Sequence, residues 1–288
     1  MSRVLLFAAI LSTVAIWGCV KQPQLIDTDN YREASSEESK SYLLQAQQQA
    51  AAIHSLRALI TARIKHLLSE ETLTQVLVFE RPDKLRLELF ATNLNRLVVL
   101  ISCHQGQLQA ADPINHRLYQ GAADYQNINK LLSLPFSGEE LMLWAAGRPP
   151  LLSSESLPPV SVKVEKSETR VYLSYAAGGG REFQMLFALQ SGRQLGRLLA
   201  LDAADAENNR FSTTFHWDAG LDSDNIELPR ELKFSLDALG LRGVFHLTEA
   251  RVNPDLTNVP EALFSPVLGV SWETIDLNRL KSGEVSWY

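Results

Sequence analysis

The fold is decided by the stretch FERPDKLRLEL, which runs from Phe79 to Leu89. In its second half, Leu85, Leu87 and Leu89 alternate with charged residues, and this period of two is typical of a strand with one apolar face. The tripeptide Arg81-Pro82-Asp83 in the middle is typical of a turn. An apolar segment, a short turn and an alternating segment together predict an antiparallel hairpin.

The same alternation continues along most of the chain. Val160, Val162 and Val164 alternate with polar residues, and strands are also predicted around 211–217 and 232–236. Further candidate strands lie at 56–67, 73–80, 96–103, 107–111, 116–120, 170–175, 182–189, 194–201 and 243–252. Because the breaks between them are of hairpin length, the pattern favours an antiparallel meander over a parallel βαβ sheet.

Helices are predicted at two places. Ser35 or Ser36 can cap a helix whose apolar residues, from Tyr42 to Ile53, recur at helical spacing. Residues 125–147 predict two short helices separated by Pro135, the second with a capping box at its start. The chain is therefore predicted to be mainly β with helices (α+β), as a curved antiparallel open β-barrel with a helical lid.

The first residues have the form of a secretory signal, since an apolar stretch follows Arg3 and ends at Trp17. The stretch Ile16-Trp17-Gly18-Cys19 resembles the lipobox of bacterial lipoproteins, and this resemblance implies that Cys19 carries the lipid. The alternative is an uncleaved signal anchor with an ordinary thiol at Cys19. We expect a signal peptide over 1–18, a lipidated cysteine and flexible tether over 19–35, and a single domain over 36–288.

Composition excludes several classes of function. Hydrophobic residues make up 45% and charged residues 21%, which is a globular balance rather than a disordered one. The net charge of −6 argues against a nucleic-acid partner. If Cys19 is acylated, Cys103 has no cysteine to pair with, and its apolar strand predicts a buried, unreactive thiol.

Motifs for catalysis are missing from the sequence. There is no G-x-S-x-G elbow, no H-E-x-x-H, no phosphate-binding glycine loop and no paired-cysteine metal pattern. The six histidines are scattered, and none is paired at the helical spacing of metal ligands. We therefore expect a protein that is not an enzyme and needs no metal and no cofactor, although a lipid-modifying enzyme is the weakest of three alternatives.

Several segments resemble, in the same order, the LolA/LolB superfamily of bacterial lipoprotein carriers. They are the turn and strand at 79–88, the Gly106 turn, Asp112-Pro113, residues 117–121, residues 131–135 and residues 139–141. The resemblance covers about residues 50–150. It implies an open β-barrel with a helical lid and a hydrophobic cavity for acyl chains. In that family, the membrane-anchored member receives lipoproteins for insertion into the outer membrane.

Two sets of residues are the candidate site. The family's membrane-anchored member has an exposed leucine in the loop corresponding to 91–95, so the resemblance implies a membrane-insertion role for Leu94; the alternative is an ordinary surface leucine. The predicted ligand cavity is lined by Leu87, Leu89, Val98, Leu100, Leu131, Leu141 and Trp144. A filled core built from the same residues is the alternative.

The sequence thus predicts a lipid-anchored, periplasm-facing protein of the outer membrane. Its expected partners are membrane lipid and acyl chains, together with other lipoproteins or an envelope assembly. It would bind an acyl chain or lipoprotein in its cavity and assist delivery to the outer membrane. The alternative function is a structural or adaptor lipoprotein that docks a partner in an envelope assembly.

Overall fold

The computed structural model describes residues 28–66, 69–92, 96–151, 160–217, 221–223, 226–265, 272–281 and 285. The predicted signal peptide, Cys19 and Leu94 lie outside these residues. Among the helices of the described part, none is long and apolar enough to cross a membrane.

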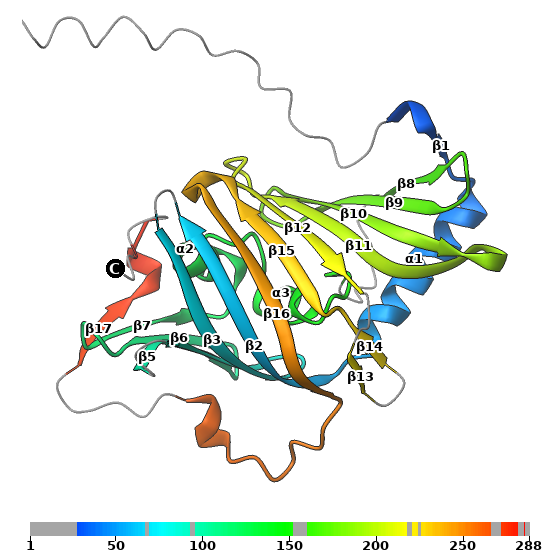
Figure 1. Cartoon of the computed structure of the whole chain (residues 1–288). Helices are drawn as coiled ribbons and strands as arrows, with labels where there is room; N and C mark the ends of the chain where they lie inside the picture. The colour runs from blue at the N-terminus through cyan, green and yellow to red at the C-terminus, as the bar shows by residue number, and fades with distance from the viewer. Residues whose placement is uncertain are drawn as a thin grey trace, which may run out of the picture.

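One curved sheet of fifteen strands dominates the structure (Figure 1). Its spatial order is β1-β8-β9-β10-β11-β12-β15-β16-β2-β3-β4-β5-β6-β7-β17, and all neighbours are antiparallel except β17 and β7. The strands are β1 (Tyr31–Glu33), β2 (Ser55–His66), β3 (Ser69–Glu80), β4 (Lys84–Ala91), β5 (Arg96–His104), β6 (Gln107–Asp112), β7 (Arg117–Ala122), β8 (Val160–Glu165), β9 (Arg170–Ala177), β10 (Arg181–Gln190), β11 (Gln194–Ala204), β12 (Arg210–His216), β15 (Glu231–Leu236), β16 (Leu241–Val252) and β17 (Glu273–Asp276).

The sheet curls without closing, since β1 and β17 are its two ends and do not pair with each other. Two further strands, β13 (Leu221–Ser223) and β14 (Ile226–Leu228), form a separate hairpin. The predicted α+β class, a curved and open antiparallel barrel with helices, is confirmed.

The hairpin at 79–89 contacts the end of the first helix and the start of a lid helix. Phe79 pairs with Leu85, and Leu77 with Leu87, across β3 and β4. In the turn, the guanidinium of Arg81 donates to the carbonyl oxygens of Ala50 (2.7 Å) and Ile53 (3.1 Å) and to Glu139 Oε1 (2.9 Å). It therefore caps carbonyls at the end of the first helix and holds the start of a lid helix.

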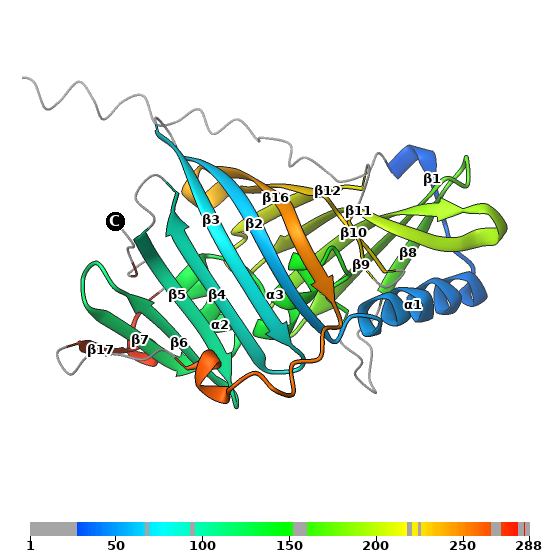
Figure 2. The same ribbon diagram turned by 60° about the horizontal axis from the view of Figure 1, so that its bottom comes forward.

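The first helix, α1 (Ser36–Ala51), begins with the predicted capping box between Ser35 and Glu38. It packs beside β11, as Figure 2 shows. Two glutamines of α1, Gln45 and Gln49, contact the sheet through their side chains. Gln45 Oε1 accepts from the Leu195 amide and Gln49 Nε2 donates to the Leu195 carbonyl, so the two glutamines satisfy backbone groups at the start of β11.

One part of the predicted tether belongs to the sheet instead. Tyr31–Glu33 form β1 and pair with β8. The Arg32 guanidinium also bonds the carboxylate of Glu38 on α1 at 2.8 and 2.9 Å. This edge strand and ion pair fix a segment whose three residues are too few to show a period.

The two lid helices are α2 (Tyr125–Leu132) and α3 (Gly138–Ala145), on the concave side of the sheet (Figures 1 and 2). Ser137 and Glu140 form the predicted capping box of α3. Glu140 also makes a buried ion pair with Arg181 of β10. This pair joins α3 to the half of the sheet that contains β10.

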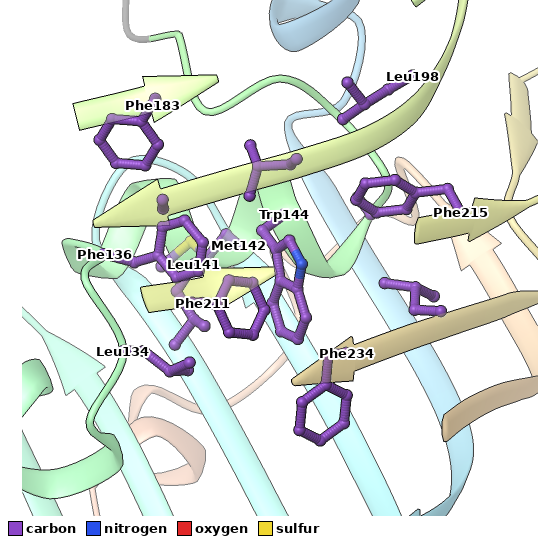
Figure 3. Close-up of a cluster of buried hydrophobic side chains, with 14 of the residues drawn as sticks. Leu134, Phe136, Leu141, Met142, Trp144, Phe183, Leu198, Phe211, Phe215 and Phe234 are labelled. Atoms are coloured by element: carbon purple, nitrogen blue, oxygen red, sulfur yellow. The ribbon is translucent and has the colours of Figure 1, made fainter. Parts of the chain in front are cut away.

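Aromatic rings surround Trp144 beneath the lid (Figure 3). The indole ring makes edge contacts with Phe211 (5.2 Å between centroids) and Phe245 (5.9 Å) and stacks on Phe136 (5.9 Å). Figure 3 shows Phe136 and Phe211 beside the indole ring. Such ring pairs stabilise a core beyond the area that they bury. The lid is thus anchored by a packed aromatic cluster at one end of the barrel interior.

Candidate functional site

An apolar pocket of about 250 Å³ lies between the lid helices and the concave face of the sheet. All its lining residues are apolar except Glu71 and Gln75. They are Ile60, Ile64, Glu71, Leu73, Gln75, Leu77, Leu85, Leu87, Leu89, Ala91, Val98, Val99, Ile101, Leu132, Leu134, Leu141, Trp144, Ala145, Phe211, Leu232, Phe234, Leu236, Leu241, Phe245 and Leu247. The barrel interior described here is therefore hollow over part of its length.

The pocket reaches the surface at one end of the barrel. Five partly or fully exposed lining residues, Ile64, Glu71, Ala91, Val98 and Leu241, lie at strand ends on that side. The end of β2, the start of β3, the end of β4, the start of β5 and the turn between β15 and β16 lie at this same end. We call this end the mouth; the aromatic cluster around Trp144 lies deeper.

The structure brings five of the seven predicted cavity residues to the pocket: Leu87, Leu89, Val98, Leu141 and Trp144. Leu87 and Leu89 share the inward face of β4. Val98 reaches the pocket because a register shift in the β4–β5 ladder leaves it without a cross-strand partner on β4.

Two predicted cavity residues do not line the pocket. Leu100 is opposite Glu88, on the outer face of the sheet that the 3-10 helix η4 (Glu261–Phe264) contacts. Leu131 is buried in the core, and its neighbour Leu132 lines the pocket in its place, since successive helical residues point about 100° apart. Leu94 lies outside the described residues, although Ala91, just before that loop, lines the pocket.

Sequence reasoning missed the aromatic wall formed by Phe211, Phe234 and Phe245, and it missed Glu71 and Gln75. The strands of Phe211 and Phe234 were predicted with one apolar face, but nothing showed which end of that face is hollow. Gln75 was the available signal. This residue is only 4% exposed and occupies an inward position between Leu73 and Leu77, where a filled core would place an apolar residue.

Polar chemistry in the pocket is sparse. Glu71 is exposed at the mouth and Gln75 lies further in. The indole N–H of Trp144 is buried and has no hydrogen-bond partner in the described part of the chain. With so few polar groups, the pocket can select a ligand mainly through burial of apolar surface.

Cys103 does not contribute reactive chemistry. It is a free, buried thiol on β5, and burial raises its pKa to about 12. The thiolate, which is the reactive form, is therefore scarce at neutral pH. Among the described residues, no group of three or more His, Cys, Asp or Glu side chains is placed to hold a metal ion.

No protein-family model matches the sequence, and no curated protein matches it. Solved structures are similar in fold. A domain from Vibrio parahaemolyticus described as an outer membrane lipoprotein-sorting protein aligns with a TM-score of 0.52 and 13% identity, over 79% of this chain and 97% of that one. A DUF1329 family protein from Desulfovibrio piger aligns with a TM-score of 0.52 and 11% identity, over 78% and 96%.

A LolA superfamily protein from Nitrosomonas europaea aligns with a TM-score of 0.49 and 10% identity, over 79% of this chain and 97% of that one. At these identities the likeness concerns the fold. The open curved sheet, the internal lid and the alignment with the lipoprotein-sorting domain agree with the fold expected from the sequence resemblance. This chain therefore shares its fold with the lipoprotein-sorting domain and the DUF1329 protein.

Proposed function

We propose that this protein is a membrane-anchored, periplasm-facing lipoprotein that binds an acyl chain in its pocket and assists delivery of that chain, or of the lipoprotein carrying it, to the outer membrane. The pocket carries this proposal. It is hollow, almost entirely apolar and open at one end, as a site for a hydrocarbon chain must be.

The volume sets the size of the bound segment. A pocket of about 250 Å³ has room for a run of methylene groups rather than for a single small molecule such as water. Burial contributes about 0.8 kcal/mol for each CH₂ that enters the pocket, before the costs of association. The remainder of a longer chain would leave through the mouth. Transfer would then run on hydrophobic burial, without a chemical step.

Two residues outside the described part complete the proposal. Cys19 would carry the lipid anchor, because two or more acyl chains hold a protein stably on a membrane. Cys19→Ala should therefore release the protein into the soluble periplasmic fraction or block its processing. Continued membrane retention at the normal mature mass would exclude lipidation at this residue.

Leu94 would enter the headgroup boundary beside the mouth, with its side chain gaining roughly 1.5–3 kcal/mol if fully buried. Leu94→Glu should leave the melting temperature and ligand binding nearly unchanged while weakening transfer to membranes. If Leu94→Glu unfolds the protein, Leu94 belongs to the core. If it changes nothing, Leu94 is an ordinary surface residue.

An apolar fluorescent probe tests the pocket itself. In a Cys19→Ala background, the probe should bind saturably at micromolar protein and quench tryptophan emission. Trp144→Phe should remove much of the quenching, since Trp144 lines the pocket. Trp217→Phe is the matched control, because Trp217 is buried elsewhere and bonds the Leu198 carbonyl. Absence of saturable binding would contradict the carrier function and favour the adaptor.

A further inference from the structure

An apolar side chain is exposed at the mouth. Three large hydrophobic residues of the described part stand out as exposed: Leu44 (56%), Ile114 (45%) and Leu239 (43%). Leu239 ends the 3-10 turn η3 (Asp237–Leu239) between β15 and β16. The residues on either side of this turn, Leu236 and Leu241, line the pocket. Leu239 is therefore the exposed tip of a hairpin whose base forms the pocket wall.

Cationic side chains lie on the outer face at the same end. Lys65 of β2 and Arg242 of β16 are cross-strand partners, and both are exposed. Arg63 lies two residues from Lys65 on the same face, with its guanidinium 3.4 Å from His246 Nε2. Like charges placed directly opposite each other destabilise a sheet. The arrangement at Lys65 and Arg242 would be relieved by an anion bound between them.

Acidic residues at this end do not neutralise the cations by contact. Glu70 is the cross-strand partner of Lys65 on β3, Glu71 lines the pocket and Asp237 begins the turn. In the described part, no ion pair within 4.0 Å joins any of these acids to Arg63, Lys65 or Arg242. Lys65 and Arg242 thus make no ion pair with these acids, while Arg63 lies within hydrogen-bond distance of His246.

We propose that Leu239, Lys65, Arg242 and Arg63, which we call the mouth rim, dock on a bilayer that contains anionic phospholipid. Leu239 enters the boundary between headgroups and acyl chains, and the cations bind lipid phosphates. This inference rests on the proposed function and deepens it, because the bilayer becomes the partner that the pocket faces. An acyl chain leaving the pocket would then pass into the membrane without crossing water.

Site-specific fluorescence tests the docking. In a Cys19→Ala background, Cys103 is buried, so an environment-sensitive dye would react only with an introduced surface thiol. The dye on Leu239→Cys should shift to the blue when vesicles of phosphatidylcholine and phosphatidylglycerol are added. Leu44→Cys, on α1, is the matched control and should not shift. Ala238→Cys, in the same exposed turn, is a second labelling site if Leu239→Cys lowers the melting temperature.

The role of the cations is tested with two double variants, each of which removes one pair of facing cations on β2 and β16. Lys65→Gln/Arg242→Gln should raise the lipid concentration for half-maximal shift roughly 30-fold, from about fivefold for each cation removed. The control variant Arg57→Gln/Arg251→Gln removes the other like-charge pair of β2 and β16, which lies at the end away from the mouth. It should leave the lipid concentration for half-maximal shift unchanged. Vesicles of phosphatidylcholine alone should bind the protein weakly, because they carry no net negative charge.

The outcomes separate this inference from the proposed function. Any of three results would overturn the docking surface. The dye could shift equally at Leu239→Cys and Leu44→Cys, or it could shift at neither Leu239→Cys nor Ala238→Cys. The third such result is an equal effect of the two double charge variants on vesicle binding. Pocket binding is measured separately, with the apolar probe and without vesicles. A dye shift without probe binding would leave the membrane surface standing while the carrier function fails.

Discussion

The buried ion pair between Arg181 and Glu140 provides the sharpest test of how the lid is held. The two side chains are 9% and 5% exposed. Arg181 also donates to the carbonyl oxygens of Gly178 (2.8 Å) and Pro135 (3.2 Å), and Glu140 accepts from the Ser137 amide at 2.6 Å. Arg181→Met keeps the apolar stem but removes the charge. It leaves the Glu140 carboxylate buried without a counter-ion.

Breaking a buried pair from one side costs about 3–5 kcal/mol, because the remaining charge is uncompensated. With a urea m-value of about 3 kcal/mol/M, the unfolding midpoint of Arg181→Met should fall by about 1–1.7 M. Urea titration followed by tryptophan emission measures this shift.

A double variant separates loss of charge pairing from loss of packing. Arg181→Met/Glu140→Gln removes both charges, and the glutamine amide oxygen can still accept from the Ser137 amide. It should recover more than half of the stability lost in Arg181→Met, because no unpaired charge remains. A loss below about 1 kcal/mol in Arg181→Met, or a double variant less stable than the single one, would refute the role given to this pair.

Three further predictions concern single residues. In a background lacking the other cysteine, Cys103 should resist alkylation in native protein and react only on unfolding, as thiol titration with and without urea will show; fast native labelling would contradict its burial. The hydrogen-bonded guanidinium of Arg32 lowers the pKa of Glu38 from 4.5 to about 2. Because the pKa of Glu38 is lower in the folded state, the ion pair contributes to the free energy of unfolding above about pH 4.5, and this contribution is lost as the pH falls towards 2. Glu38→Gln should therefore reduce the change in the free energy of unfolding between these pH values. An unaltered pH dependence would exclude the contribution. Gly147→Ala should lower the melting temperature more than Gly106→Ala, since both have positive φ but only the new Cβ at Gly147 meets a proline side chain at 2.6 Å; equal losses would show that the clash is relieved.

The strands were largely predictable because alternation records which side of a sheet each residue occupies. Val160, Val162 and Val164 fall in β8, and the hairpin at 79–89 is formed by β3 and β4 as expected. Short strands escaped prediction. β17 spans Glu273–Asp276 and pairs in parallel with β7, and a contact so distant in the chain has no local signature.

The pocket was only partly predictable, because a filled core and a hollow one place the same residue types inward. Whether space remains depends on how side-chain volumes from distant strands add up. Leu100 was misplaced because the run from Leu97 to Ile101 is apolar on both faces, and its outward side is covered by residues near 261–264. Gln75 held the clearest local sign of a cavity, since it is polar at an inward position.

Affinity as a function of acyl chain length tests the central claim most directly. Saturated fatty acids of increasing length, titrated against the fluorescent probe in the Cys19→Ala protein, should bind about fourfold more tightly for each added CH₂. The gain should stop once the chain fills the pocket, because carbons added beyond that length extend through the mouth into water. Saturable binding with this plateau is the predicted result. No saturable binding at any length, or an unbroken increase through the longest chains, would contradict a pocket of this size as the acyl-chain site.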